Sequence, residues 1–180
     1  MIKKRATMFI SEEKISLRIA EPQDAQQIYD WENDRSLWRV SETSNPISMF
    51  QIEQFLLSNS DLAANRQLRL MIDLKETGKS IGCVDLFEYD PFNGRIGIGI
   101  MIEEAYRKQG FAQKAIALCI DYLFNNVMVH QIHCLIDEQN TESQHLFEKM
   151  GFKPCGRRKD WIKTPEGYID AVFYQNVKQS

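Results

Sequence analysis

The chain has 180 residues, which suits a single domain rather than two with separate large cores. Its hydrophobic fraction of 43% and charged fraction of 26% are ordinary for a globular protein and argue against disorder. The 22 basic and 25 acidic residues give a formal net charge of −3, which disfavours nonspecific nucleic-acid binding and mildly favours a cationic substrate. No apolar run reaches the roughly 20 residues of a membrane span. We therefore expect neither nucleic acid nor membrane as a partner.

The cysteine pattern and the first residues bear on compartment and domain limits. Four cysteines are widely spaced: Cys83, Cys119, Cys134 and Cys155. Because no two of them form a CxxC pair, no zinc or redox motif is indicated, and we expect buried free thiols in a reducing cytoplasm. The apolar run at 6–10 is too short for a signal sequence. We expect an N-terminal arm over 1–14 and one domain over 15–178.

The first half of the chain is predicted as a strand, two helices and a hairpin. Residues 15–19 alternate like a half-buried strand, and Pro22 opens a helix. Ser48 is a candidate cap for a second helix. Two strands, 68–74 and 80–89, flank a tight turn that contains Gly78.

The second half alternates strands and helices. The expected elements are a strand over 95–102, a helix from 110 to about 127, a strand over 131–137, a helix over 141–150, and two strands joined at 164–167. Gly151 is expected to end the second of these helices. Gly97 and Gly99 interrupt an apolar strand, which indicates a bulge, a close approach of another group, or room for a packed helix. The order implies a mixed sheet with helices over its faces.

One segment carries an anion-binding signal, because it follows an apolar strand and opens an amphipathic helix. It reads Arg107-Lys108-Gln109-Gly110-Phe111-Ala112. A helix N-terminus presents unpaired N–H groups and a partial positive charge, so phosphates bind there readily. Gly110 lets the backbone approach a phosphate, Ala112 keeps the second approach point small, and Arg107 adds a cation. Taken without its flanks, Gly110 could equally be an ordinary loop glycine.

This segment, with the strand before it, resembles the acetyl-CoA-binding motif of the GCN5-related N-acetyltransferases, Arg/Gln-x-x-Gly-x-Gly/Ala. A second stretch, 140–152, is similar to a later motif of that family that ends in Gly-Phe, here Gly151-Phe152. Leu17-Arg18 with Asp24, and then 33–36, are similar to the opening of the spermidine and ribosomal-protein N-acetyltransferase branch. The resemblance covers nearly the whole chain, apart from 1–14.

The resemblance implies an α/β fold. Its central sheet would be mostly antiparallel, splayed between the fourth and fifth strands, 95–102 and 131–137, with helices on both faces. Acetyl-CoA would lie in the splay. The main chain at Ile100, Met101 and Ile102 would bind the pantetheine arm. The six residues from Arg107 to Ala112 would wrap the pyrophosphate, and Phe111 would contribute apolar packing there.

The same resemblance places Asn140, Ser143 and Phe147 along the wall of the splay. Asn140 could instead serve as a helix cap, since Thr141 with Gln144 fits the capping-box pattern. In the family a tyrosine commonly protonates the leaving thiolate, and Phe147 stands at that position here. A general acid at that position is therefore excluded, and water, another side chain or direct departure of the thiolate must serve.

Acetyl transfer also needs a base, because an ammonium cannot attack. Asp85 and Glu88 are the candidates on the strand 80–89. Three residues apart on a regular strand, they would face opposite sides, and we favour Glu88; both could also be ordinary solvent-facing residues. Asp137 and Glu138 are alternatives. His133 and His145 could titrate near neutrality, although a lone histidine is more often structural.

For the acceptor, acidic residues after the first helix bind the cation in the resembling polyamine enzymes. The chain has Glu32, Asp34 and Glu42 there. Glu42 lacks the adjacent second acid that is common in that branch, so no metal is indicated. Trp31 and Trp38 could face a cation or belong to the core.

The sequence thus predicts an enzyme that transfers acetyl from acetyl-CoA to a primary amine, with a polyamine such as spermidine as the leading acceptor. One alternative is acetylation of protein N-termini, as in ribosomal-protein acetyltransferases. Another is a CoA-binding or sensing module without catalysis, which Phe147 motivates. The branch also implies a homo-oligomer, a dimer or larger.

Overall fold

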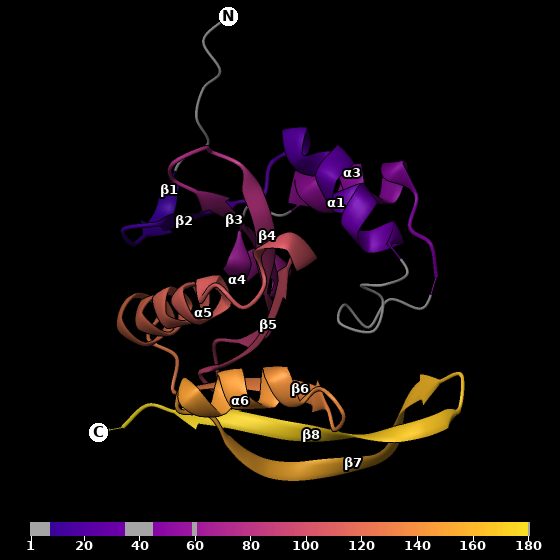
Figure 1. Ribbon diagram of the computed structural model, residues 1–180. Helices are drawn as coiled ribbons and strands as arrows, with labels where there is room; N and C mark the ends of the chain where they lie inside the picture. The colour runs from indigo at the N-terminus through magenta and orange to yellow at the C-terminus, as the bar shows by residue number, and fades with distance from the viewer. Residues whose placement is uncertain (1–7, 35–44, 59–60, 180) are drawn as a thin grey trace, which may run out of the picture.

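The computed structural model describes residues 8–34, 45–58 and 61–179. Its centre is one eight-stranded sheet in the order β1-β2-β3-β4-β5-β6-β8-β7 (Figure 1). The strands are β1 (Met8–Ser11), β2 (Ile15–Ile19), β3 (Leu68–Leu74), β4 (Ser80–Asp90), β5 (Arg95–Ile102), β6 (Gln131–Asp137), β7 (Lys153–Thr164) and β8 (Gly167–Val177). The α-helices of the described residues are α1 (Ala25–Asn33), α3 (Met49–Ser58), α4 (Leu62–Asn65), α5 (Phe111–Tyr122) and α6 (Thr141–Lys149).

The local signals locate most of these elements correctly. Ser48 Oγ accepts a hydrogen bond from the Gln51 N–H at 3.2 Å, as expected of the cap of α3. Gly151 adopts a φ of +87° just beyond α6, which ends the helix where a left-handed residue was predicted. The sequence did not indicate β1 or α4, because four residues are too few for a periodic pattern. β1 lies in the segment expected as an arm and pairs with β2.

The sheet is antiparallel at every junction except one. β5 and β6 run parallel, and their ladder contains only Arg95–Gly97 against Gln131–His133. Beyond Gly97 the two strands separate, while β5 stays paired with β4 as far as Ile102. This confirms the mixed sheet splayed between the strands 95–102 and 131–137.

Helices cover both faces of the sheet, as predicted (Figure 1). The larger core lies under α5 and α6 and is formed by side chains that include Leu70, Ile72, Val84, Ile98, Ile116, Cys119 and Phe147. The smaller core lies under α1 and α3 and includes Ile28, Trp31, Ile52, Leu56, Met71, Cys83 and Met101. The alternation of β3 and β4 thus sends successive side chains into two separate cores.

The cysteines are unpaired thiols. Cys83, Cys119 and Cys134 are buried, as expected, but Cys155 is exposed, because it lies on the outermost strand, β7. The expectation of four buried thiols is therefore wrong for Cys155. Among the described residues, no helix has both the length and the apolar character to cross a membrane.

Candidate active site

The first cavity lies between the end of β5 and the starts of α5 and α6, and we call it the helix-end cavity. Its volume is about 550 Å³. Most of the residues predicted to hold acetyl-CoA line it: Ile100, Met101, Ile102, Arg107, Lys108, Gly110, Phe111, Ala112, Asn140 and Ser143. The segments around Gly110 and Asn140, 30 residues apart in the sequence, therefore line the same cavity, beside the point where β5 and β6 separate.

The N-terminus of α5 fits a phosphate. Gly110 has a φ of +81°, and a Cβ built there would meet nothing within 4 Å, so the space beside it is open. No side chain among the described residues caps this helix end, which leaves the first-turn N–H groups available to an anion. Arg107 Nε donates to the Ile102 carbonyl oxygen at 3.0 Å and so ties the loop to the end of β5. The residues present thus fit a pyrophosphate at this helix end, which we call the cradle, and their individual contacts with the pyrophosphate stay predictions.

The edge of β5 that faces the splay fits an amide-bearing arm. On its other edge β5 pairs with β4, with Ile100 opposite Val84 and Ile102 opposite Gly82. Its ladder with β6 ends at Gly97, so within the described residues the facing edge from Ile98 onward has no strand partner. An extended ligand with amide groups can add to such an edge as another strand would.

Two predicted cofactor residues do not line this cavity. The Gln109 side-chain amide donates to the Ala105 carbonyl oxygen at 3.0 Å and so turns back along its own loop. Phe147 is buried, and its ring packs edge-to-face on Phe152 with centroids 5.0 Å apart. The expectation that Phe147 lines the wall is wrong, because Phe147 is buried in the larger core, whereas Ser143, one helical turn nearer the N-terminus of α6, lines the cavity.

Asn140 both lines the cavity and caps a helix. Its Oδ1 accepts a hydrogen bond from the Ser143 N–H at 3.1 Å, at the N-terminus of α6. The helix-cap alternative is therefore correct for Asn140, although the cap is Asn140 itself and not the Thr141 of the suggested capping box. Its position in the cavity leaves the predicted contact with acetyl-CoA as a prediction.

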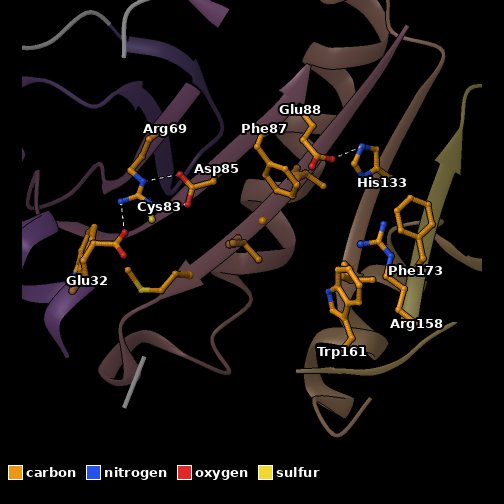
Figure 2. Close-up of a pocket in the computed structure, with 16 residues that line it drawn as sticks. Glu32, Arg69, Cys83, Asp85, Phe87, Glu88, His133, Arg158, Trp161 and Phe173 are labelled. Atoms are coloured by element: carbon orange, nitrogen blue, oxygen red, sulfur yellow. Dashed lines mark hydrogen bonds and ion pairs between the residues drawn. The ribbon is translucent and has the colours of Figure 1, made fainter. Parts of the chain in front are cut away.

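A second cavity, of about 460 Å³, opens among β3, β4, β5, β6 and the β7–β8 hairpin (Figure 2). We call it the bulge cavity. Its lining includes Trp31, Glu32, Arg69, Cys83, Asp85, Phe87, Glu88, His133, Arg158, Trp161 and Phe173. It shares Ile100 and Met101 with the helix-end cavity. The two cavities therefore meet at β5, where that strand has separated from β6.

Two irregular strand positions shape the bulge cavity. In β4 the register shifts between Phe87 and Asp90, and Glu88 has a φ of +51°. Asp85 and Glu88 consequently both line the cavity, so the expectation that they face opposite sides is wrong. In β7 the register shifts between Arg158 and Ile162, with a φ of +49° at Asp160. That bulge likewise brings two residues three apart, Arg158 and Trp161, to the cavity.

Arg69 neutralises the two acids on one side of the bulge cavity (Figure 2). Its Nε and Nη2 donate to the two Asp85 carboxylate oxygens at 2.6 and 2.9 Å, and Nη1 donates to Glu32 Oε1 at 2.6 Å. Burial alone would lower the pKa of Arg69, but the Asp85 and Glu32 carboxylates hold it well above its usual value. Glu32, expected to bind a cationic substrate, is thus already paired.

His133 lies where β5 and β6 separate. Its ring stacks on Phe173 with centroids 5.3 Å apart, meets Phe87 edge-on at 6.1 Å, and brings Nε2 to 3.9 Å from Glu88 Oε2. Burial lowers the pKa of His133 from 6.5, the nearby Glu88 carboxylate opposes this, and the charges of Arg95 and Arg158 add to it. His133 is therefore a neutral, proton-accepting imidazole near pH 7. Sequence reasoning gave it little weight.

Phe87 was not singled out either, although a signal for it existed. It pairs with Gly97 in the β4–β5 ladder, and a Cβ on Gly97 would lie 2.3 Å from the Phe87 ring. The close approach that the in-strand glycine predicted is thus the ring of its cross-strand neighbour, and it keeps Phe87 against His133.

The other predicted acids lie elsewhere. Asp34 lines a separate hollow along α1, with Asp30, Glu103 and Glu104 among its neighbours. Glu138 pairs with Arg157 at 3.1 Å, and neither Glu138 nor Asp137 lines the bulge cavity. His145 lines the helix-end cavity instead. Glu42 and Trp38 lie outside the described residues.

Comparison with known proteins agrees with this architecture. The model of the acetyltransferase (GNAT) domain matches residues 14–153. The chain belongs to this family. It is an acetyl-CoA-dependent N-acetyltransferase, which confirms what the two motifs indicated.

The relatives differ in acceptor. The spermidine N(1)-acetyltransferase of Escherichia coli is 25% identical over 146 residues, 81% of this chain and 76% of that one. The spermidine N-acetyltransferase of Vibrio cholerae, solved with CoA and spermine, superposes with a TM-score of 0.82 at 23% identity, over 92% of this chain and 96% of that one. A ribosomal-protein-S5-alanine acetyltransferase from Vibrio fischeri also gives a TM-score of 0.82, at 19% identity, over 97% and 98% of the two chains. At these identities the solved structures share the fold with this chain.

Proposed function

We propose that this GNAT enzyme acetylates the primary amine of a small acceptor that binds in the bulge cavity. The observation that carries the proposal is the junction of the two cavities at Ile100 and Met101, beside the separated ends of β5 and β6. An acyl donor held on one side and an amine held on the other would meet there. Proximity of this kind accounts for a large part of acyl-transfer catalysis.

The helix-end cavity would hold acetyl-CoA, which supplies the acetyl group as a thioester. The first-turn N–H groups of α5 and the Arg107 side chain would bind its pyrophosphate, and the β5 edge from Ile100 to Ile102 would bind its amide arm. Ser143 and Asn140, at the start of α6, line the same cavity. These roles stay predictions for the individual residues.

We further propose His133 as the base, assisted by Glu88. The imidazole is neutral at pH 7 and lines the cavity, so it can take the proton from the incoming ammonium. The carboxylate 3.9 Å away would stabilise the resulting cation. Glu88, favoured from sequence as the base, has a side chain 75% exposed to water and suits this supporting role better. Both carboxylate oxygens of Asp85 are engaged by Arg69.

In this scheme the amine nitrogen forms a bond to the acetyl carbon, the carbon–sulfur bond breaks, and sulfur leaves as the thiolate. The nitrogen loses two protons in all: His133 takes the first from the ammonium before attack and passes it to water, and the second leaves the nitrogen to water as the tetrahedral intermediate collapses. Because Phe147 is buried and its side chain has no acidic proton, the residue at that position cannot protonate the leaving group. A free thiol has a pKa of about 8.5, so direct departure is feasible near neutral pH.

The acceptor was expected to be a polyamine, with protein N-termini as the alternative. The spermidine acetyltransferase relative supports the first and the ribosomal-protein acetyltransferase fold neighbour supports the second. The Glu32–Arg69 pair weakens the polyamine case, because the carboxylate meant for the cation is engaged. Family membership speaks against the third alternative, a CoA sensor without catalysis, and a homo-oligomer stays a prediction.

The test measures acetyl-CoA-dependent thiol release with polyamines, diamines, amino acids and short peptides. We expect turnover with one acceptor class, and we expect His133→Gln to lower kcat by about a hundredfold or more without changing acetyl-CoA binding. His130→Gln is the matched control, since His130 is exposed and lies outside the cavity. Binding of acetyl-CoA without turnover of any amine would favour the sensor. Full activity of His133→Gln would remove His133 from the mechanism.

A further inference from the structure

We propose that the acceptor carries a carboxylate, which pairs with Arg158 on the wall of the bulge cavity formed by β7. The inference deepens the proposed function and rests on it, because it assigns the substrate class of the same cavity. It concerns an amine that also bears a negative charge, in contrast to a polyamine. Three features of the β7–β8 hairpin carry it.

The first feature is that Arg158 lacks the ion pairs that the other arginines near it form within the described residues. Among the described residues no carboxylate forms an ion pair with it, whereas the neighbouring Arg157 pairs with both Glu138 and Asp170, at 3.1 and 3.2 Å. Arg69, the other guanidinium of the cavity, takes both Asp85 and Glu32. Arg158 is thus a cavity cation whose charge the described part of the chain does not balance. A guanidinium is well suited to bind a carboxylate through two hydrogen bonds.

The second feature is how Arg158 is held. Its guanidinium carbon lies 4.6 Å from the centroid of the Trp161 ring and 6.0 Å from that of Phe173 (Figure 2). Rings at these distances attract the cation and limit its orientations without consuming its hydrogen-bond donors. The donors remain available to a ligand. Trp161 is also 52% exposed, an unusual state for so large a side chain, and it faces the cavity.

The third feature is the bulge that puts Arg158 there. On a regular strand Arg158 and Trp161 would face opposite sides of β7. The left-handed backbone at Asp160 brings them together, and the Asp160 N–H donates to Asp170 Oδ1 at 2.9 Å, which fixes the bulge. A non-glycine residue held in the left-handed region by a hydrogen bond indicates that the surrounding structure maintains a strained conformation, as is common at functional sites.

The resulting charge pattern selects an acceptor. Glu88 and His133 lie on β4 and β6, at the end where the amine would react, and Arg158 extends from β7 (Figure 2). An amine that bears a carboxylate complements both ends, whereas a polyamine would place a second ammonium near Arg158. A cavity of about 460 Å³ suits a molecule the size of an amino acid or a short peptide end. The carboxylate could belong to a free amino acid or to an acidic peptide side chain.

The experiment compares kcat/KM for acceptors that differ in the carboxylate alone. The pairs are lysine against cadaverine, 4-aminobutyrate against propylamine, and Ala-Glu against Ala-Gln dipeptide amides; spermidine is measured beside them. We expect the wild type to prefer the carboxylate member of at least one pair by about tenfold or more, as a charged hydrogen bond allows. The first two pairs report a free amino acid, and the third reports a peptide side chain.

Two variants assign the preference to Arg158. We expect Arg158→Gln to lower kcat/KM for the carboxylate acceptor by about tenfold to a hundredfold and to change that of its matched amine by less than about threefold. Lys159→Gln is the control, because it removes a neighbouring exposed charge that lies outside the cavity, and it should keep the preference. Arg158→Glu should reverse the preference toward cadaverine or spermidine. Equal losses for both members of a pair would overturn the proposal.

Failure of the inference can be told apart from failure of the proposed function. Turnover of spermidine or diamines with no carboxylate preference overturns the inference and keeps the acetyltransferase. If no amine is turned over, calorimetry with lysine, 4-aminobutyrate and Ala-Glu amide, with and without CoA, still decides. Binding of any of these that Arg158→Gln removes and Lys159→Gln keeps supports the inference, and the absence of such binding overturns it.

Discussion

The two cavities of this enzyme are built in different ways. The helix-end cavity offers a ligand main-chain groups at three places: the N-terminus of α5, the left-handed turn at Gly110 and the edge of β5 beyond its ladder with β6. The bulge cavity is lined by side chains that six strands and one helix contribute. Main-chain groups bind the parts that every acyl-CoA has in common, whereas side chains can be substituted to suit a different acceptor. The contrast explains how relatives with different acceptors keep one fold.

The cavities also differ in how charge is arranged. The helix-end cavity offers N–H groups and cations to one polyanionic ligand. The bulge cavity mixes both signs, with Arg69 clamped between Glu32 and Asp85, and with Glu88 and Arg158 left toward the ligand. Each of the following changes acts on one cavity and leaves the other intact.

The largest effect is expected from Gly110→Glu. The substitution puts a side chain and a negative charge into the cradle, so we expect the affinity for acetyl-CoA to fall by about a hundredfold or more. Gly78→Glu is a close control, because Gly78 also has a positive φ of +69° and open space around it but lies in the β3–β4 turn. Calorimetry with acetyl-CoA measures both. Unchanged affinity in Gly110→Glu would contradict the assignment of the cradle.

The next effect concerns stability and the bulge cavity. Arg69→Met removes the guanidinium that pairs with both Asp85 and Glu32, so we expect the free energy of unfolding to fall by about 3–5 kcal/mol. Arg95→Met removes an arginine that is paired with Asp90 at the surface, and it should cost less than about 1 kcal/mol. Urea unfolding measures both. Adding Glu32→Gln and Asp85→Asn to Arg69→Met should restore part of the loss.

The helix-end cavity could be predicted from the sequence more readily than the bulge cavity. The cradle and its helix could be predicted because Arg107 to Ala112 are contiguous and glycine marks the turn. The bulges could not, since Glu88 and Asp160 are not glycines and no local pattern announces a left-handed residue there. The Arg69–Asp85 pair depends on the β3–β4 register, which links residues 16 apart. Gly97 did carry a signal, and the hairpin register identifies its partner, Phe87.

A smaller effect is the pH dependence contributed by His133. Its pKa in the folded state lies below the ordinary 6.5, so the unfolded chain binds the proton more tightly. This contribution to stability is therefore full above about pH 6.5 and is lost as the pH falls toward the folded-state value. We also expect kcat/KM to fall on acidification through the same lowered pKa. His133→Gln should flatten the acidic part of both the stability profile and the kcat/KM profile, whereas His130→Gln should not.

The smallest effect expected is also the one in which stability and activity change in opposite directions. Glu88 holds a φ of +51°, a conformation that costs an L-residue about 1–2 kcal/mol and glycine little, although glycine loses about 0.5–1 kcal/mol through its more flexible unfolded chain. We expect Glu88→Gly to gain about 0.5–1 kcal/mol in urea unfolding while it lowers kcat. Glu88→Gln keeps the strain and loses the charge, so it should lower kcat without the gain. Equal stability of the two variants would show that the bulge stores no strain. A gain confined to Glu88→Gly would mean that the chain gives up stability at this position to direct a carboxylate toward His133.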